Sequence, residues 1–259
     1  CHFLDNGWGN SPGIAGGGYG AAIKIVGANA QIEDSTIVHN YGGNGSGAVE
    51  ADYSDLIMTR NVVQSNQSHY DASGISINYT AFTLTNNLIV ENESTYWWDE
   101  HETVEIRNSS GQMVHNTIAR NDTLYGVKVW NASTVFMTNT ILVSHTMGIT
   151  VAQSSIVSLE ATLWGSGAWA NGADWGGDGT IATGSIDIRE LPHFVNPDGG
   201  NYHITADSAA VDAGVDAGVD DDVDGDARPH DGDDDGSAAP DIGADELADY
   251  VFLPLVLRR

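Results

Sequence analysis

Basic residues are scarce in this chain of 259 residues, which has nine lysines and arginines against 36 aspartates and glutamates. The formal net charge is -27 at neutral pH. A surface of that sign repels phosphate groups, which excludes nucleic acid and anionic membranes as partners. The same charge favours metal cations as ligands and a saline, extracellular setting.

Cysteine and long apolar runs are almost absent. The single cysteine, Cys1, allows no internal disulfide. The longest strongly apolar run, residues 250–257, is shorter than the roughly 20 residues of a membrane-spanning helix, so no membrane span is predicted. Cys1 has two interpretations: a position within a repeat, or the lipidated first residue of a mature bacterial lipoprotein.

Helical periodicity is also missing from residues 1–175. Instead, one pattern recurs six times with constant internal offsets, which is the signature of a solenoid. The first column of equivalent positions contains Ser35, Asn61, Asn87, Asn116, Asn139 and Ala161. Three apolar columns accompany it: Ile37, Val63, Ile89, Ile118, Ile141 and Leu163; Ile32, Met58, Leu84, Met113, Phe136 and Ser158; and Ile25, Ala51, Ile77, Ile106, Val129 and Val151.

Short alternating segments identify the repeat unit. Residues 74–77 and 127–129 alternate apolar and polar side chains, as strands do, and turn-forming residues separate such segments. Stacked asparagine amides about 4.8 Å apart can hydrogen-bond along the column. We therefore predict an all-β chain, with a right-handed parallel β-helix over residues 1–175. The alternative is a β-sandwich with accidental periodicity.

The same frame places the first residues inside a coil. Phe3 falls in an apolar column. A second asparagine column contains Asn6, Asn40, Asn66, Asn92 and Asn121. The chain is therefore expected to begin in mid-coil, either because residues precede it in the full protein or because the open end meets another molecule.

N-x-S/T triplets accept glycans in a eukaryotic secretory route. Most of the triplets recur at the same two turn positions, so repeat-derived asparagine turns are the simpler interpretation. The seven triplets begin at Asn44, Asn66, Asn78, Asn92, Asn108, Asn121 and Asn131.

Acidic residues are concentrated near the carboxyl end. The spacing D-x-D-x-D-G occurs at residues 220–225 and again at 231–236. Carboxylates at alternate positions of a tight loop converge, and oxygen-only ligands suit Ca²⁺, which we predict as the cofactor. The alternative is a solvated acidic linker. The predicted calcium ligands are Asp220, Asp222, Asp224, Asp226, Asp231, Asp233, Asp235 and Asp241.

The segments PHFVNP at 192–197, SAAVDAG at 208–214, DVDG at 222–225 and DIGADE at 241–246 together resemble the carboxy-terminal signature of choice-of-anchor Q proteins. These are secreted bacterial right-handed β-helix proteins of the pectate-lyase-like superfold. The resemblance implies secretion or surface display and brings no catalytic residues with it. The doubled Asp-rich loop is longer than the usual form, so the calcium prediction depends on ligand spacing.

Two further segments are predicted beyond the repeats: an irregular capping region, residues 176–249, and an apolar tail, residues 250–259. Residues 250–257 are rich in strand formers. Added as a strand to the open first coil of the next molecule, they would build a head-to-tail homopolymer. The alternative is a tail that folds back on its own helix.

A candidate carbohydrate site lies in an insertion, residues 96–102, with the sequence YWWDEHE. Its aromatic rings can stack on sugars, and its carboxylates can act as acid and base. The alternative is a loop whose tryptophans cover the flank of the helix. The predicted site residues are Trp97, Trp98, Glu100 and Glu102.

The remaining charges have simpler interpretations. Glu91 with Arg120, and Glu105 with Lys128, are predicted to form ladder ion pairs on a wet face. Three scattered aspartates are interpreted as solvated turn residues: Asp52, Asp55 and Asp71. No nucleophilic triad or Cys/His metal spacing is evident, so no catalytic residue is predicted.

These features favour a non-enzymatic extracellular protein with a structural role at the cell surface or in fibres. The alternative is a calcium-dependent β-helix that binds or degrades polysaccharide through the 96–102 insertion. The partners considered are further copies of the chain and a cell-surface glycan.

Overall fold

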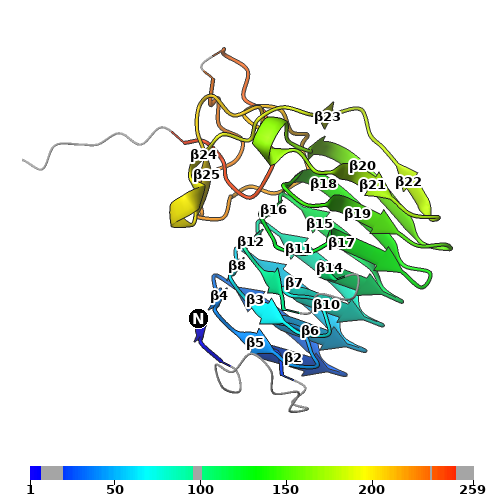
Figure 1. Ribbon diagram of the computed structural model, residues 1–259. Coiled ribbons are helices and arrows are strands. Elements are labelled where there is room, and N and C mark those ends of the chain that lie inside the picture. Colours follow the sequence, from blue (N-terminus) through cyan, green and yellow to red (C-terminus); the bar gives the residue numbers. More distant parts are fainter. Residues whose placement is uncertain (7–19, 96–100, 234, 249–259) are drawn as a thin grey trace, which may run out of the picture.

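The computed structural model describes residues 1–6, 20–95, 101–233 and 235–248. These residues are almost entirely β-structure, arranged as a parallel β-solenoid of about six turns (Figure 1). The predicted parallel β-helix is therefore confirmed. Among the described residues, no helix is long and apolar enough to cross a bilayer.

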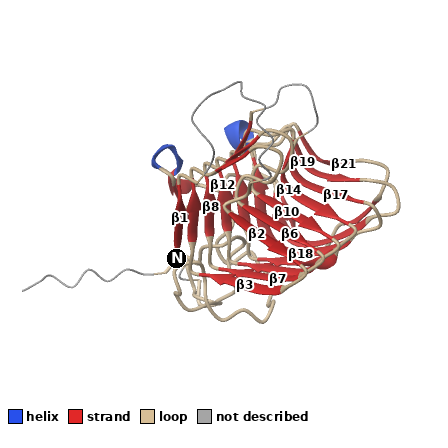
Figure 2. Cartoon of the chain, turned by 90° about the horizontal axis from the view of Figure 1, so that it is seen from below, coloured by secondary structure: helices blue, strands red, loops and turns tan. Residues whose placement is uncertain are grey.

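Each turn contributes one strand to each of three faces, which Figure 2 shows as separate stacks. The first face comprises β2 (Ile23–Val26), β6 (Val49–Asp52), β10 (Ile75–Asn78), β14 (Glu102–Arg107), β17 (Tyr125–Trp130), β19 (Met147–Val151) and β21 (Ala173–Gly176). The second face comprises β3 (Asn29–Glu33), β7 (Asp55–Thr59), β11 (Ala81–Thr85), β15 (Ser110–Val114), β22 (Thr180–Ala182) and the first halves of β18 (Thr134–Val143) and β20 (Ile156–Leu163).

The third face comprises β1 (His2–Leu4), β4 (Thr36–Val38), β8 (Val62–Gln64), β12 (Leu88–Val90), β16 (Thr117–Ala119), the second halves of β18 and β20, and β23 (Asp187–Ile188). A short stack of β5 (Tyr41–Gly42), β9 (Gln67–Ser68) and β13 (Glu93–Ser94) follows this face. All pairs within these stacks are parallel, and Phe3 lies opposite Ile37 as the frame predicted.

The core lies between the three faces because alternate residues of each strand point inward. Its fully buried members include Ile37, Met58, Ile77, Leu84 and Ile106. A strand of this solenoid can bury its apolar side only against the other faces and the neighbouring turns, which is why no single repeat is a stable unit.

Three polar ladders run through the corners of the solenoid. In the first, the side-chain oxygen of Asn87 accepts the backbone N–H of Asn61 at 3.1 Å and its amide N–H at 2.9 Å. The same contacts recur along the predicted second column, for example from Asn66 to Asn92. The third ladder consists of hydroxyl groups that accept N–H bonds from the preceding turn: Ser54, Thr80, Ser109, Ser133 and Ser155.

These ladders bear on the N-x-S/T triplets. Asn66, Asn92 and Asn121 are buried in the second ladder, and Thr80 and Ser133, the hydroxyl residues of the triplets at Asn78 and Asn131, belong to the hydroxyl column. The triplets at these positions thus arise from the internal hydrogen bonding of the repeat. This agrees with their interpretation as repeat-derived turns.

Three of the four predicted repeat columns are wrong by one residue in the last two turns, whereas the column from Ile25 to Val151 is confirmed. Met113 pairs with Met137 rather than Phe136, and Ile118 pairs with Leu142 rather than Ile141. The cause is an extra residue in the turn before β18, where Asn131 and Ala132 both adopt positive φ. A slip of one residue exchanges the inward and outward sides of a strand.

The slip moves several predicted core residues outward. The side chain of Phe136 is 55% exposed, and Leu159, not Ser158, continues the inner column. Asn139 lies opposite the turn residue His115 instead of Asn116, so the first asparagine ladder ends at Asn116. The sequence could not reveal this insertion, because the alignment with the extra turn residue and the alignment without it both place an apolar residue at or next to each core position.

The solenoid ladder extends to Ile188, beyond the boundary expected near residue 175, because β21, β22 and β23 pair with β19 and β20. Residues 189–248, here called the flank region, then pack along the third face, beside β12, β16 and β18 (Figure 1). The region contains one antiparallel pair, β24 (Phe194–Asn196) and β25 (Asn201–Ile204).

A second apolar cluster joins the flank region to the solenoid. Leu88, Ala119 and Ile141 from the third face pack with Tyr202 and Ile242. Ile141 and Leu163, predicted as inner residues, therefore face this second cluster. The flank region covers the side of the coils, whereas the sequence predicted a cap.

Polar contacts fix the flank region across several turns. Arg60 donates to Asp221 at 2.8 Å, and the Tyr202 hydroxyl donates to Glu91 at 2.9 Å. Further along, the Asn139 amide and the backbone of Val215 exchange two hydrogen bonds, at 2.7 and 2.9 Å.

Candidate functional site

The predicted carbohydrate site is only partly within the described residues. Trp97, Trp98 and Glu100 lie outside them, so the groove that they were expected to line stays a prediction. Glu102 is the first residue of β14 and is buried, with 4% of its surface exposed.

Glu102 belongs to a compact group of carboxylates on the first face. Its side chain, Asp71 and Glu105 each offer an oxygen within 4.8 Å of the others, and we call this group the acidic cluster. Glu102 and Glu105 extend from the same strand, while Asp71 comes from the turn that precedes β10.

Several donors contact the acidic cluster, and the backbone N–H of Ala72 donates to Asp71 at 2.8 Å. The Ser76 hydroxyl and the indole N–H of Trp130 donate to Glu105, each at 3.1 Å. The Lys128 ammonium contacts Glu102 at 3.3 Å. Lys128 was predicted to pair with Glu105, which lies opposite it in the neighbouring strand. It pairs instead with Glu102, the first residue of β14.

Burial keeps part of the cluster protonated near neutral pH. It raises the pKa of Asp71 to about 6, with a further contribution from the charge of Glu105. Burial also raises the pKa of Glu102 to about 7, against the opposing effect of the Lys128 ammonium. Asp71 was interpreted as a solvated turn residue, but it is only partly exposed and its carboxylate lies with those of Glu102 and Glu105.

The other predicted ladder pair is also absent. Glu91 accepts hydrogen bonds from Gln64 at 2.9 Å and from Tyr202, while Arg120 pairs with Asp198 at 2.8 Å. Glu91 and Arg120 each contact a residue of the flank region, Tyr202 and Asp198 respectively. An alignment of the repeats does not include that region and so could not predict these contacts. Besides Lys128 with Glu102, the first face contains a second ion pair between neighbouring strands, Lys24 with Glu50 at 2.7 Å.

The predicted calcium ligands are divided among different places. Asp222 is fully buried, and its carboxylate accepts the backbone N–H groups of Asp224, Asp226 and Glu246 at 2.8–3.0 Å. Asp241 is also buried and accepts two backbone N–H groups at 2.7 Å. These two side chains therefore hold the loops of the flank region together.

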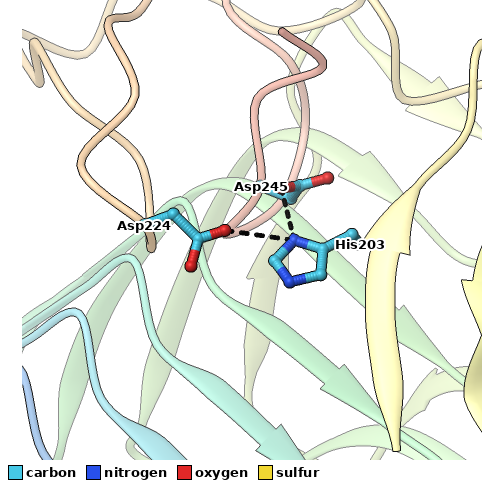
Figure 3. A group of neighbouring side chains, drawn as sticks. All are labelled: His203, Asp224 and Asp245. Carbon is cyan, nitrogen blue, oxygen red and sulfur yellow. Dashed lines mark hydrogen bonds and ion pairs between the residues drawn. The ribbon is translucent and has the colours of Figure 1, made fainter. Parts of the chain in front are cut away.

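The carboxylate of Asp224 points toward His203 and does not converge with that of Asp222, as a calcium site shared by the two would require. The Asp224 carboxylate lies 3.4 Å from Nδ1 of His203, and Asp245 lies 2.8 Å from the same nitrogen (Figure 3). The hydrogen bond with Asp245 raises the pKa of His203 to about 9, so the imidazole is charged at neutral pH. Asp245 also accepts the backbone N–H of Ile204 at 2.7 Å, which orients it.

The second Asp-rich loop brings two predicted ligands together. Asp231 and Asp233 lie with Asp212, each offering a carboxylate oxygen within 4.8 Å of the others. Backbone N–H groups already order this loop: Asp231 accepts from Asp235 at 3.1 Å and from Gly236 at 2.9 Å. Of the remaining predicted ligands, Asp220, Asp226 and Asp235 are not among the residues grouped here.

Sequence reasoning missed several of these side chains. Asp71, Glu105 and His203 have the residue types of a site but no motif spacing, whereas Asp212 and Asp245 lie in the SAAVDAG and DIGADE segments without having been assigned as ligands. Stacking brings Asp71 to Glu102, and chain folding brings Asp245 to His203 from 42 residues away. The available signal was the alternation in β14, which places Glu105 on the outer side of the first face.

No protein-family model, curated protein or solved structure matches this chain.

Proposed function

We propose that this chain is a non-enzymatic, extracellular structural protein of the cell surface or of fibres. The observation that supports the proposal best is the flank region, which ties successive turns together from Arg60 to Asn139. Together with three internal polar ladders, it favours a rigid rod whose outer faces are available to partners. The resemblance to choice-of-anchor Q proteins is in keeping with surface display.

The second face supports the same role. Its outward positions carry mostly polar side chains along successive strands, such as Asp55, Thr83, Gln112 and Thr134, with three exposed apolar residues among them: Ile57, Phe136 and Ile156. An open face of mixed polar and apolar residues suits repeated lateral contacts better than the enclosure of a small substrate.

Head-to-tail assembly belongs to this proposal. β2 and β3 are the first described strands of the first and second faces, and β21 and β22 are the last. Within the described ranges no further strand pairs with their outer edges, and an unpaired edge can accept an added strand. The predicted docking segment, residues 250–257, lies outside the described residues.

Electron microscopy and analytical ultracentrifugation of the purified protein, with and without a calcium chelator, test the assembly. We expect ordered polymers that shorten or disappear on chelation. Monodisperse particles under both conditions, at concentrations up to those of a dense surface layer, would contradict the fibre role.

Calcium is proposed as a ligand of Asp212, Asp231 and Asp233. Three carboxylates that converge within 4.8 Å fit a hard cation, which prefers oxygen ligands. Asp212 accepts N–H bonds from Gly232 and Ala239, both at 2.9 Å, and these bonds position the group without using all of its lone pairs.

A second function, carbohydrate binding or cleavage at the acidic cluster, is favoured by one specific observation. The carboxyl groups of Glu102 and Asp71 lie within 4.8 Å of each other, and burial raises the pKa of both, to about 7 and about 6. One protonated and one ionised carboxyl group are what glycoside hydrolysis requires, and a short separation is typical of retaining enzymes, at roughly 5–5.5 Å.

A polysaccharide panel tests this second function. We expect Glu102→Gln and Asp71→Asn to abolish any release of reducing ends, while the exposed control Glu33→Gln retains it. Unchanged activity in both cluster variants would assign the hydrolysis to another group, and no activity in the wild type would leave the structural role alone.

A further inference from the structure

The corner between the first and second faces carries a column of outward residues. Successive turns place Gly27, Tyr53, Tyr79 and Asn108 there, as their backbone N–H bonds show: Tyr53 donates to Asn78, and Tyr79 donates to Arg107. Two neighbouring positions of this column are therefore aromatic.

The two tyrosine rings stack on each other along the axis of the solenoid. Their centroids are 4.7 Å apart and their planes differ by 3°. Both rings are nonetheless open to solvent, with 63% of Tyr53 and 49% of Tyr79 exposed. The pair is thus an aromatic platform on the surface and contributes little to the core.

Backbone conformation makes these tyrosines unexpected. Tyr53 and Tyr79 have φ values of 50° and 47°, in the left-handed region that suits glycine and asparagine better than a bulky residue. Gly27 and Asn108, at the two ends of the column, are residues of the favoured kind. Internal packing therefore gives no reason for aromatic rings at the two middle positions.

A hollow adjoins the ring of Tyr79 on the side away from Tyr53. It is lined by Tyr79, Asn108, Ser110 and Ala132, together with Thr80 and Ala81. The hollow exists because Asn108 stands where a third stacked ring would lie, and because Ala132 in the following turn is small.

The hollow is polar but uncharged. The hydroxyl groups of Thr80 and Ser109 are used inside the corner, where they bond to backbone carbonyls. Within the described part of the chain, no such bond is formed by the side-chain amide of Asn108 or the hydroxyl of Ser110. Both groups can donate and accept, and both adjoin the ring of Tyr79.

We propose that this hollow binds one neutral sugar ring of a glycan chain. A pyranose presents an apolar C–H face, which packs on the free face of Tyr79, and a rim of hydroxyl groups, which pair with Asn108 and Ser110. The uncharged lining selects a neutral sugar over a uronate or a sulfated sugar. The site uses none of the carboxylates of the acidic cluster, and it gives the proposed structural role a partner that the rod displays or adheres to.

Isothermal titration of the purified full chain with cellohexaose, mannohexaose and xylohexaose tests the site. We expect binding of at least one of these neutral oligosaccharides, weakened at least tenfold in Tyr79→Asn and several-fold in Asn108→Ala. Tyr79→Phe should bind like the wild type because the ring face makes the contact. Asparagine is chosen at position 79 because it accepts the backbone conformation there, as Asn108 does.

Matched controls separate this site from the other functions. Tyr70→Ala removes another exposed tyrosine and should leave binding unchanged, and thermal melts should show all variants folded. The proposal is overturned if none of the three oligosaccharides binds, or if Tyr79→Asn binds as tightly as the wild type. It is also overturned if binding is lost only in Glu102→Gln, which would place the sugar at the acidic cluster.

Discussion

At the scale of single residues, the most consequential side chains are amides inside the solenoid. Asn87 is fully buried, accepts two N–H bonds from Asn61 and donates to the carbonyl of Met58 at 3.1 Å. Each such residue satisfies the backbone of two turns at a corner where strand pairing is interrupted. The core therefore depends on polar specificity as well as on apolar burial.

Truncating one ladder amide should be costly. Asn87→Ala leaves the backbone N–H of Asn61 without its acceptor in a dry environment, and such an orphaned group costs about 1–3 kcal/mol. The lost bonds from the Asn87 amide to Met58 and Asn116 add about 0.5–1.5 kcal/mol each. We expect a loss of about 2–5 kcal/mol in the free energy of unfolding, measured by urea denaturation. Asn29→Ala, on an exposed position of β3, is the control and should change it by less than about 0.5 kcal/mol.

His203 gives the molecule a defined pH dependence. Its folded pKa of about 9 exceeds the value of about 6.5 expected in an unfolded chain, so the protonated side chain stabilises the fold. This contribution is complete below about pH 6.5 and is lost as the pH rises through 9. In His203→Gln, urea midpoints should fall less between pH 6 and 9.5 than in the wild type. Parallel curves for the two proteins would show that His203 has no such role.

At the scale of elements, the flank region depends on a buried ion pair. Arg228 and Glu246 lie 2.9 Å apart with no exposed side-chain surface, and Arg228 also donates to the carbonyl of Asp241 at 2.9 Å. Removing one member of such a pair leaves the other charge buried without compensation.

Arg228→Met should therefore loosen the flank region selectively. We expect a loss of about 3–5 kcal/mol, seen as faster hydrogen exchange in residues 189–248 than in the solenoid strands. Arg189→Met is the matched control, since Arg189 forms exposed pairs with Asp174 and Asp187 that contribute about 0–1 kcal/mol. Uniform loss of protection along the whole chain would show that the flank region is not a separate unit.

The elements also show how far the sequence could lead. The strands of the first four turns and both asparagine columns were predictable, because apolar alternation and corner amides recur at fixed offsets from Ile25 to Asn116. The fifth turn was not, because Asn131 and Ala132 occupy a turn with one more residue than the equivalent turn at Asn108. Sequence offsets do not distinguish an insertion in a turn from one in a strand.

At the scale of the whole molecule, acidic charge is the dominant property. A net charge of -27 opposes any compact form, and carboxylates that converge, as at Asp212, Asp231 and Asp233, concentrate that repulsion locally. A bound cation would relieve it and would stabilise the folded chain in proportion to its occupancy.

Calcium should consequently raise the melting temperature beyond the effect of ionic strength alone. At a calcium concentration about 100 times the dissociation constant, the expected gain is about 2.7 kcal/mol. Melting curves in calcium chloride and in sodium chloride of equal ionic strength measure the difference. We expect the double variant Asp231→Asn, Asp233→Asn to lose it, whereas Asp178→Asn, an exposed aspartate outside the loop, should keep it.

The acidic residues also explain why the candidate sites were only partly predictable. The D-x-D-x-D-G spacing drew attention to the region, but the backbone directs Asp222 inward and Asp224 toward His203. The spacing of aspartates along a loop limits how far apart their carboxylates can lie. It does not predict which hydrogen-bond donors those carboxylates will accept from. The acidic cluster depends on contacts between turns, so residues 31 positions apart, Asp71 and Glu102, meet without any local motif.

The flank region has a mechanical consequence. A bare solenoid resembles a one-dimensional stack in which each turn holds only its neighbours, so it can peel from either end one turn at a time. Asp221 bonds to Arg60 and Asn86 in two adjacent turns, and Val215 bonds to Asn139, two turns beyond Asn86. The flank region therefore links turns that do not touch directly. Under tension, the solenoid should therefore resist unfolding one turn at a time. We expect the turns that the flank region links to unfold together in a single cooperative event.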